Sequence, residues 1–182
     1  MLTKTPYIVE QFQYIVEDVA TRYGDTVNYQ FGHVIEIINT LKELSKTQRT
    51  SPAKFPLVCL FQDFTEEKGG ASDTESKVKL NLIVAMMTKP TYTASDRYRI
   101  TLKPVLYPIY EILITSIIRS GYYKLTTLSK PPKHKKTDRL FWGKSGLYGS
   151  AGNQFNDYID AIEITDLELE VYKQHCEPTS NL

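Results

Sequence analysis

Three carboxylates near the end of the sequence have side chains that could hold a divalent metal ion. They are Asp157, Asp160 and Glu163, and hard cations prefer carboxylate oxygens. In an extended strand, however, Asp157 and Asp160 point to opposite faces, and Asp160 is one residue out of parity with Glu163. A shared metal ion would therefore need a β-bulge. We interpret all three as solvated carboxylates at a strand edge, with a metal site as the alternative.

No other grouping of reactive side chains matches a catalytic or cofactor motif. His33, His134 and His175 do not stand at metal-ligand spacing with one another or with a cysteine. The sequence has no Gly-rich phosphate loop, nucleophile elbow or dinucleotide fingerprint. We therefore predict no catalytic, cofactor-binding or metal-binding residue and no cofactor, and we expect a protein that is not an enzyme.

A basic segment followed by aromatic residues is the strongest candidate for a binding surface. Its basic and aromatic members are Lys130, Lys133, His134, Lys135, Lys136, Phe141 and Trp142. Such a cluster can contact phosphate groups or an acidic protein surface, or it can be a solvated loop. The aromatic side chains can stack on bases or fill pockets of a partner. The formal net charge of only +1 favours a protein interface.

The basic segment belongs to a long stretch, 129–155, that the sequence predicts to be irregular. Ordering a backbone costs about 1–2 kcal/mol per residue, whereas burying one aromatic side chain returns only about 1.5–3 kcal/mol. We therefore expect a neighbouring subunit to supply contact surface, with Trp142 as the main anchor. The alternative is that Trp142 folds back onto its own sheet. The predicted interface residues are Lys130, Lys133, His134, Lys135, Lys136, Phe141, Trp142, Leu147, Tyr148 and Phe155.

Residues 76–121 predict a strand followed by a long helix, and the rest of the chain is expected to cover this unit or pair with it. Apolar side chains recur at every second position from Val78 to Met86, as in a strand with one buried face. The helix is expected to be capped by Ser95 or Asp96 and to end at Gly121.

Two prolines interrupt the pattern of that helix. Pro104 and Pro108 cannot donate a backbone hydrogen bond, and each ring clashes with the preceding turn. The sequence therefore predicts a kinked helix, or two helical pieces with the second starting near one of the prolines.

Two amphipathic helices are predicted before this unit. The first is expected to begin at Thr5-Pro6 and to end at Gly24, and the second to follow Gly32. The remaining extended segments are 27–31, 55–64, 122–128 and 158–172. The segment 55–64 is apolar on both faces, which predicts an interior strand. Helices can cover one of its sides, and another subunit is a candidate for the other.

Two irregular features are predicted within the strands. The parity of the apolar residues in the last strand shifts by one at Thr165-Asp166, which predicts a bulge or break there. The connection Thr65–Glu75 contains Gly69-Gly70 and no large apolar residue. We expect it to be a hairpin tip that is disordered in the free subunit.

The overall composition is that of an ordinary globular protein. With 182 residues and 41% hydrophobic residues, the chain is expected to form a single domain, 1–182, with an ordered core of roughly 5–172. The predicted fold class is α/β (α+β): a mixed sheet of about four strands, packed mainly on one face by two N-terminal helices and a kinked central helix. Two cysteines and no signal or membrane segment predict a reducing, cytosolic environment.

Several stretches of the sequence together resemble a known family. They are Tyr29-Gln-Phe-Gly-His33, Phe55-Pro-Leu-Val-Cys-Leu60, the strand at Leu80 to Met86, the run from Tyr98 to Tyr110 with its Pro-x-x-x-Pro helix, and Phe155-Asn-Asp-Tyr-Ile-Asp-Ala-Ile-Glu163. This order resembles small structural proteins of tailed phages and prophages of gut Bacteroidetes, including crAss-like phages. It is also similar to tail-terminator and head–tail connector proteins.

The resemblance implies a tail-terminator-like fold and a non-enzymatic subunit of a ring in the phage neck or tail. It further implies a homo-oligomer ring, contacts with other neck or tail proteins and passive contact with passing DNA. The location would be the virion, and the host cytoplasm during assembly. No catalytic residue is carried over from the family. The alternative is a nucleic-acid-binding or metal-dependent nucleic-acid-processing protein that uses Lys130 to Lys136 and Trp142, with Asp157 and Asp160 near a metal.

Overall fold

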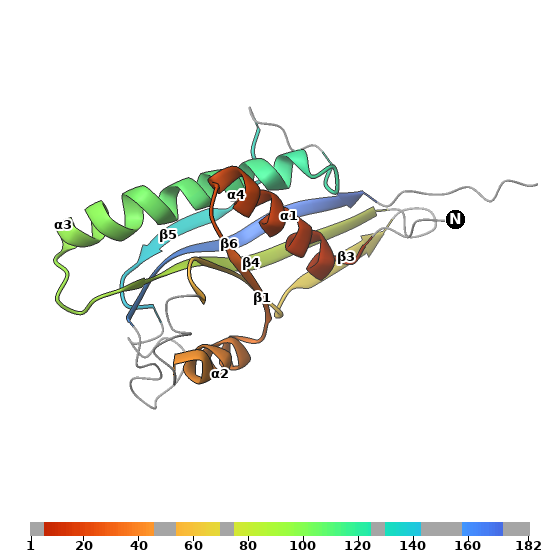
Figure 1. The fold of residues 1–182 in the computed structure, drawn as a ribbon. Coiled ribbons are helices and arrows are strands. Elements are labelled where there is room, and N and C mark those ends of the chain that lie inside the picture. The colour runs from red at the N-terminus through yellow and green to blue at the C-terminus, as the bar shows by residue number, and fades with distance from the viewer. Residues whose placement is uncertain (1–5, 46–53, 70–74, 125–129, 143–157, 173–182) are drawn as a thin grey trace, which may run out of the picture.

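A mixed sheet of six strands forms the centre of the protein (Figure 1). The computed structural model describes residues 6–45, 54–69, 75–124, 130–142 and 158–172. The strands are β1 (Asn28–Gly32), β2 (Leu57–Phe61), β3 (Thr65–Gly69), β4 (Glu75–Thr88), β5 (Lys135–Arg139) and β6 (Tyr158–Tyr172). The sheet order is β1-β2-β4-β6-β5, and β3 pairs with β4 beyond the end of β2.

The long antiparallel pair β4–β6 is the backbone of this sheet. β4 pairs with β6 along its whole length, from Glu75 opposite Tyr172 to Thr88 opposite Tyr158. On the other side of β4, β2 pairs with Leu82–Ala85 and β3 with Glu75–Lys79, both antiparallel. β1 lies parallel to β2, so α2 (Val34–Ser45) crosses over between them.

The predicted bulge in the last strand is confirmed. Leu80 lies opposite Leu167 and Leu82 lies opposite Ile164, so Thr165 and Asp166 together face Asn81. The backbone of Asp166 has a φ of 55°, and its amide donates to Oδ1 of Asn81 at 3.1 Å. The extra residue keeps apolar side chains of both halves of β6 on the same face of the sheet.

Helices cover the central strands of one face of the sheet (Figure 1). These are α1 (Ile8–Tyr23) and the run of α3 (Ala94–Arg97), the π-helical segment η3 (Tyr98–Leu106) and α4 (Tyr107–Arg119). Their apolar stripes meet the side chains that alternate along β4 and β6. The core residues include Phe12, Val16, Val19, Leu80, Leu82, Val84, Leu106, Ile109, Leu113, Ile162, Ile164 and Leu167. The first helix ends at Gly24 as predicted, but it begins at Ile8 rather than at Thr5-Pro6.

The second helix, α2, packs on the opposite face of the sheet. Ile37 and Ile38 contact the side of β2 that carries Leu57 and Cys59, in a second core that also contains Trp142. The expectation that all helices lie mainly on one face is therefore wrong. The interior strand 55–64 is confirmed as β2, which is buried at every position. Its second side is covered by this chain and needs no other subunit.

The two prolines do not break the long helical run. Thr93 is the N-cap, and it forms a capping box with Asp96, so the predicted caps Ser95 and Asp96 are each wrong as the N-cap. Pro104 lies in η3, whose wider turns accommodate it. Pro108 lies in the first turn of α4, next to the junction where the winding changes from π-helical to α-helical. The α-helical winding thus starts again near Pro108, which agrees with the predicted alternative of two helical pieces.

Three segments differ from the sequence prediction. The expected count of about four strands is wrong, because residues 65–69 and 135–139, both predicted to be irregular, form β3 and β5. The expectation of a disordered hairpin tip is therefore wrong for 65–69, and its residues 70–74 lie outside the described residues. The expected strand 122–128 is reduced, within the described residues, to one bridge between Tyr123 and Val171. Both missed strands are charged and exposed, so neither shows the apolar alternation that marks a half-buried strand.

One helical run among the described residues, Ala94–Arg119, is long and apolar enough by length and composition to cross a membrane. It packs as a core helix here. Leu106, Ile109, Leu113 and Ile117 are all fully buried against the sheet and α1. This packing accounts for its apolar composition.

Candidate functional site

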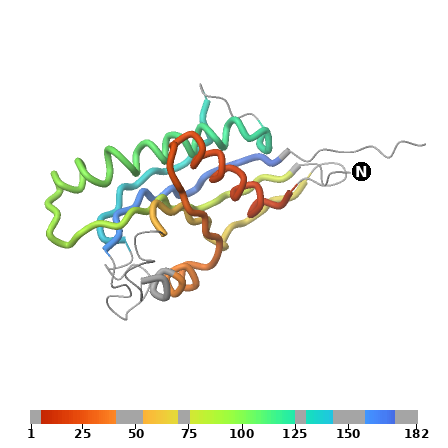
Figure 2. Tube along the Cα trace, viewed as in Figure 1, coloured from red at the N-terminus to blue at the C-terminus, as the bar shows by residue number. Residues whose placement is uncertain are grey.

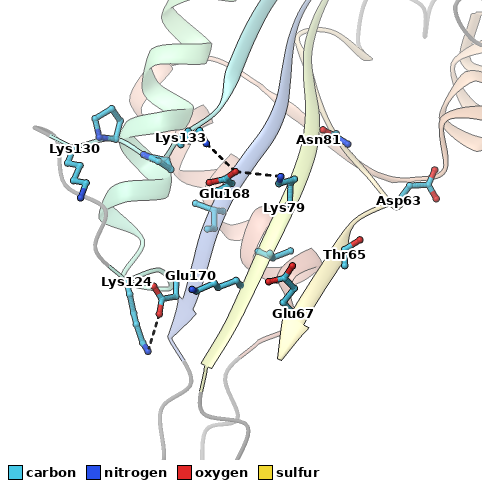
Figure 3. Close-up of a pocket in the computed structure, with 15 residues that line it drawn as sticks. Asp63, Thr65, Glu67, Lys79, Asn81, Lys124, Lys130, Lys133, Glu168 and Glu170 are labelled. Carbon is cyan, nitrogen blue, oxygen red and sulfur yellow. Dashed lines mark ion pairs between the residues drawn. The ribbon is translucent and has the colours of Figure 1, made fainter. Parts of the chain in front are cut away.

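The face of the sheet that α2 covers is open at its other end, and a groove lies there (Figure 3). It has a volume of about 830 Å³. β3, β4 and β6 form its floor, and residues 130–133 form one wall. Five lysines and four carboxylates line it: Lys77, Lys79, Lys124, Lys130, Lys133, Asp63, Glu67, Glu168 and Glu170.

Positive and negative side chains alternate across this groove. Glu168 lies 3.5 Å from Nζ of Lys79 and 3.7 Å from Nζ of Lys133, and Glu170 lies 3.7 Å from Nζ of Lys124. Figure 3 shows these pairs joining β6 to β4 and to the wall of the groove. Lys79 and Glu168 are 54% and 44% exposed, so each pair adds little stability. The groove is therefore a nearly neutral surface of interleaved charges.

The groove follows from the alternation of strand residues. On β4 the odd-numbered residues Ile83 and Ala85 face α2, whereas Lys77 and Lys79 stand on the same side farther along the strand. The bulge in β6 puts Glu168 and Glu170 on this side as well. The charged half of the strand is thus a direct continuation of its apolar half.

The predicted basic segment runs from the groove onto the edge of the sheet. Lys130 and Lys133 line the groove, and Lys135 and Lys136 belong to β5. Lys135 binds Asp166 at 2.8 Å, and this hydrogen bond holds the pKa of the Asp166 carboxyl below its ordinary value. Lys136 binds Asp138 at 2.5 Å and lies 4.6 Å from the centre of the Tyr107 ring. The lysines of β5 thus already have acidic partners within the chain.

His134 anchors this segment to the long helix. Its Nδ1 lies 2.7 Å from the carbonyl oxygen of Pro132, which can only accept, so Nδ1 carries the proton. Its Nε2 lies 2.8 Å from the hydroxyl of Tyr110. Tyr107 donates to Asp138 at 2.8 Å, and that bond raises the pKa of Tyr107 to about 12. These contacts give His134 a positional role within the subunit.

The two aromatic residues after β5 point into the protein. Trp142 is 1% exposed, stacks on Phe61 with ring centres 6.3 Å apart, and donates its amide to the carbonyl of Ile159 at 2.8 Å. Phe141 lies half-buried, 3.9 Å from the guanidinium carbon of Arg97. The structure therefore favours the alternative in which Trp142 packs on its own sheet, and it corrects the expectation of an exposed anchor. Leu147, Tyr148 and Phe155 lie outside the described residues.

A buried ion pair under the long helix was missed by the sequence analysis. Arg97 and Asp160 are 2% and 0% exposed, and Nη1 of Arg97 lies 2.6 Å from Oδ1 of Asp160. Arg97 also donates to the hydroxyl of Thr88 and to the carbonyls of Lys89 and Tyr92. The interpretation of Asp160 as a solvated strand-edge carboxylate is therefore wrong. The sequence did hold a signal for this burial, because Asp160 stands at every-second-residue spacing with Ile162 and Ile164 and so lies on the same buried face of the strand.

Of the three candidate metal-binding carboxylates, the two that the structure describes, Asp160 and Glu163, each bind an arginine. Asp160 is occupied by Arg97, and Glu163 binds Nε of Arg139 at 2.7 Å. Asp157 lies outside the described residues. Among the described residues, no group of three or more His, Cys, Asp or Glu side chains could hold a metal ion. Burial raises the pKa of the Cys59 thiol, which disfavours a thiolate there.

The groove offers alternating positive and negative side chains for polar contacts. No protein-family model matches the chain, and no curated protein matches it.

Proposed function

We propose that this protein is a non-enzymatic virion structural protein, a subunit that forms a ring in the neck or tail of a tailed phage. Its partners would be further copies of the chain and other neck or tail proteins, with passive contact with passing DNA. It would reside in the virion, and in the host cytoplasm during assembly. The tail-terminator or head–tail connector type is the finer form of this proposal, and it derives from the sequence resemblance.

The observation that carries the proposal is the open, charged half of one sheet face. The described part of the chain covers the apolar half of that face with α2 and Trp142, and leaves the half with Lys79 and Glu168 as a groove. The rims of protein–protein interfaces are polar, and complementary charges across them favour the right partner and fix its register. A ring subunit needs such surfaces toward its neighbours.

The nucleic-acid alternative receives less support from the side chains described. Lys133, Lys135 and Lys136 each lie beside a carboxylate, which lowers the positive potential that a phosphate backbone would meet. The indole of Trp142 is buried and cannot stack on a base. We therefore keep a single proposed function.

Two measurements test the proposal. Mass spectrometry of purified virions is expected to find the protein as a stoichiometric component. Mass photometry of the purified chain, alone and mixed with the neighbouring neck or tail proteins, is expected to show a closed oligomer. Absence from virions would overturn the proposal. Tight DNA binding with a steep salt dependence in a gel-shift titration would favour the alternative.

A further inference from the structure

The charged side chains of the groove form stripes that run along the strands (Figure 3). Glu67 of β3 lies opposite Lys77 of β4, and Lys77 lies opposite Glu170 of β6. One step along the strands, Lys79 lies opposite Glu168. The wall on the far side of β6 adds three lysines: Lys124, Lys130 and Lys133. Across the strands the charge therefore alternates between negative and positive, whereas along each strand it keeps one sign.

The surroundings of the groove favour a narrow partner element over a flat one. α2 stands on the apolar half of the same sheet face, and residues 130–133 form a wall beside β6. In Figure 2, α2 lies near one end of β4 and β6 and does not extend to their other end. A flat surface would therefore meet α2 and the wall before it reached Lys79 and Glu168. An α-helix laid along the strands is about 10–12 Å across, so it spans the stripes of β4 and β6, which lie about 4.8 Å apart.

The spacing along the stripes matches the repeat of a helix. Residues two apart on one strand, such as Lys77 and Lys79, are separated by about 6.6–6.8 Å. Side chains four residues apart on an α-helix are separated by about 6 Å along its axis and lie on the same face. Two acidic side chains at that spacing can therefore reach Lys77 and Lys79 together, while basic side chains on the neighbouring line of the helix reach Glu168 and Glu170.

Other kinds of occupant fit this floor less well. β4 pairs with β3 on one side and with β6 on the other, so it offers no backbone groups to an extended peptide that lies on its face. A helix satisfies its own backbone groups and needs none from the floor. Nucleic acid is disfavoured by the stripe of Glu168 and Glu170, which would repel phosphate groups.

The described helices of this chain do not carry the required pattern. The occupant needs two exposed acidic residues four positions apart. The exposed acidic residues of α1, α2 and α4 each lack an acidic residue at that spacing: Glu10, Glu17, Glu36 and Glu111. These helices also already pack on their own sheet. The complementary helix therefore belongs to a different protein.

We infer that the groove holds an α-helix of a neighbouring neck or tail protein, with acidic side chains four residues apart against Lys77 and Lys79 and basic side chains against Glu168 and Glu170. The inference rests on the proposed function, which supplies the neighbour. Lys79 and Glu168 are 54% and 44% exposed, so exchanging their mutual pair for pairs with the helix costs little. Complementary charges across the contact would fix the register of the helix. The competing explanation is that this half of the sheet face is only a solvated surface.

Zero-length cross-linking of purified virions tests the contact in place. A carbodiimide joins lysine amines to carboxylates that they touch, and mass spectrometry then identifies both residues. Lys77 and Lys79 are expected to link to a second protein, at carboxylates four residues apart in its sequence. Links from these lysines only to carboxylates of their own chain would overturn the inference. Foreign carboxylates two residues apart would also overturn it, because that spacing indicates a strand.

A synthetic peptide tests the charge pattern on the isolated chain. The probe repeats Lys-Glu-Ala-Ala, which places an acidic and a basic stripe on neighbouring lines of a helix. The control peptide repeats Lys-Ala-Glu-Ala, which has the same composition but places the two stripes on opposite faces. Fluorescence anisotropy at low salt is expected to show at least about tenfold tighter binding of the probe. Equal binding of the two peptides would overturn the inference.

Charge reversal in the groove locates the bound peptide. Lys77→Glu with Lys79→Glu, and separately Glu168→Lys with Glu170→Lys, are each expected to weaken binding of the probe at least about tenfold, because each gives the floor a single sign. Thermal unfolding checks that the variants fold. If a double variant does not fold, Lys79→Gln replaces it and is expected to weaken binding severalfold. Normal binding by folded groove variants would overturn the inference.

Matched control variants make the same change in net charge away from the groove. They are Lys89→Glu with Lys103→Glu, and Glu10→Lys with Glu17→Lys, all at exposed positions. Both are expected to bind the probe as the unmodified chain does. A loss as large as that of the groove variants would mean that net charge alone attracts the peptide, which would overturn the inference.

The outcomes distinguish this contact from the wider proposal. If the protein is a virion component but Lys77 and Lys79 link to no other protein, the helix contact is wrong and the proposed function stands. If the protein is absent from virions and yet binds the probe through the groove, the helix site stands and the proposed function is wrong. If it is absent from virions and binds both peptides equally, both are wrong.

Discussion

The two ends of the β4–β6 pair differ in what covers them. At the end that holds Ile83 and Ala85, helices cover one face, and α2 with Trp142 covers the other. At the end that holds Lys77 and Lys79, the helix face is covered and the opposite face is the groove. The strands and their pairing are continuous from one end to the other. The chain thus closes its core at one end and leaves the other end as surface.

The two ends also differ in how their charged side chains are paired. The covered end contains the ion pair of Arg97 with Asp160, which is fully buried and hydrogen-bonded on several sides. The open end carries pairs such as Lys79 with Glu168, which solvent screens. A buried charge is tolerated only with complete partners, whereas an exposed one can exchange its partner at low cost. The fold of the covered end therefore depends on its ion pair, whereas the charges of the open end can exchange partners.

The largest effect is expected at the buried ion pair. Asp160→Ala should lower the free energy of unfolding by about 3–5 kcal/mol, because it leaves the Arg97 guanidinium buried without its counter-charge. Denaturant titration measures the loss. As a control, Arg97→Met combined with Asp160→Leu should recover most of it, since apolar side chains of similar size need no counter-charge. If Asp160→Ala lowered the free energy of unfolding by less than about 1 kcal/mol, water would have to reach the Arg97 guanidinium, contrary to its burial in the structure.

The second-largest loss of stability is expected when Trp142 is removed. Trp142→Ala should cost about 3–4 kcal/mol of unfolding free energy, because it leaves a cavity beneath α2 beside Phe61. Trp142→Phe should cost less, because it retains a ring against Phe61. Thermal unfolding of both variants checks the order. An unchanged melting temperature with impaired assembly would instead restore the interface role first expected from the sequence.

At the open end a central carboxylate should contribute much less. Glu168→Gln should lower the free energy of unfolding by no more than about 0.5–1 kcal/mol, because Lys79 and Lys133 are exposed and screened. The difference from the unmodified chain should shrink further at high salt. Glu10→Gln on α1 serves as the exposed control. A cost that approaches that of Trp142→Ala would mean that the groove is part of the fold rather than a free surface.

The smallest effect should be a pH dependence at the bulge. The pKa of Asp166 lies below its ordinary value of 3.8 because of Lys135. The stabilisation from this pair is therefore complete above that value and is lost as the pH falls through the lower, folded-state pKa. Asparagine tolerates the same backbone conformation as aspartate. The melting temperature of the Asp166→Asn variant at pH 6 should therefore be slightly lower than that of the unmodified chain. The two melting temperatures should converge as the pH falls through the folded-state pKa of Asp166, and a gap that widens on acidification would contradict the assignment.

The covered end was largely predictable from the sequence, and the open end was not. The alternation from Val78 to Met86 and the parity shift at Thr165-Asp166 identify β4, β6 and the bulge, because burial of one face imposes a period of two. β3 and β5 have charged side chains on both faces, so their pairing leaves no such pattern. The packing of Phe141 and Trp142 also depends on tertiary contacts with Arg97 and α2 that sequence spacing does not reveal.

The candidate site was predicted in part for the same reason. Lys130 and Lys133 do lie on the groove, but its other lysines and carboxylates come from β3, β4 and β6. Each of those strands contributes alternate residues that look ordinary in isolation. Only the register of the sheet brings Lys79, Glu168 and Lys133 together. The sequence signal for such a surface is a strand in which every second residue is apolar along the whole length. The residues between them change from apolar at one end to charged at the other.

The π-helical winding of η3 limits insertions and deletions in this part of the chain. Arg97 and Leu106 stand nine positions apart, about two and a half turns of an α-helix, so regular winding would place them on opposite sides. Both are buried, because the wider π-helical turns return Leu106 to the side that faces the sheet. A single-residue deletion within these π-helical turns would rotate α4 relative to Arg97 and turn Leu106 away from the sheet. This stretch should therefore tolerate substitutions at its exposed positions Tyr98 and Ile100, yet admit no change in length.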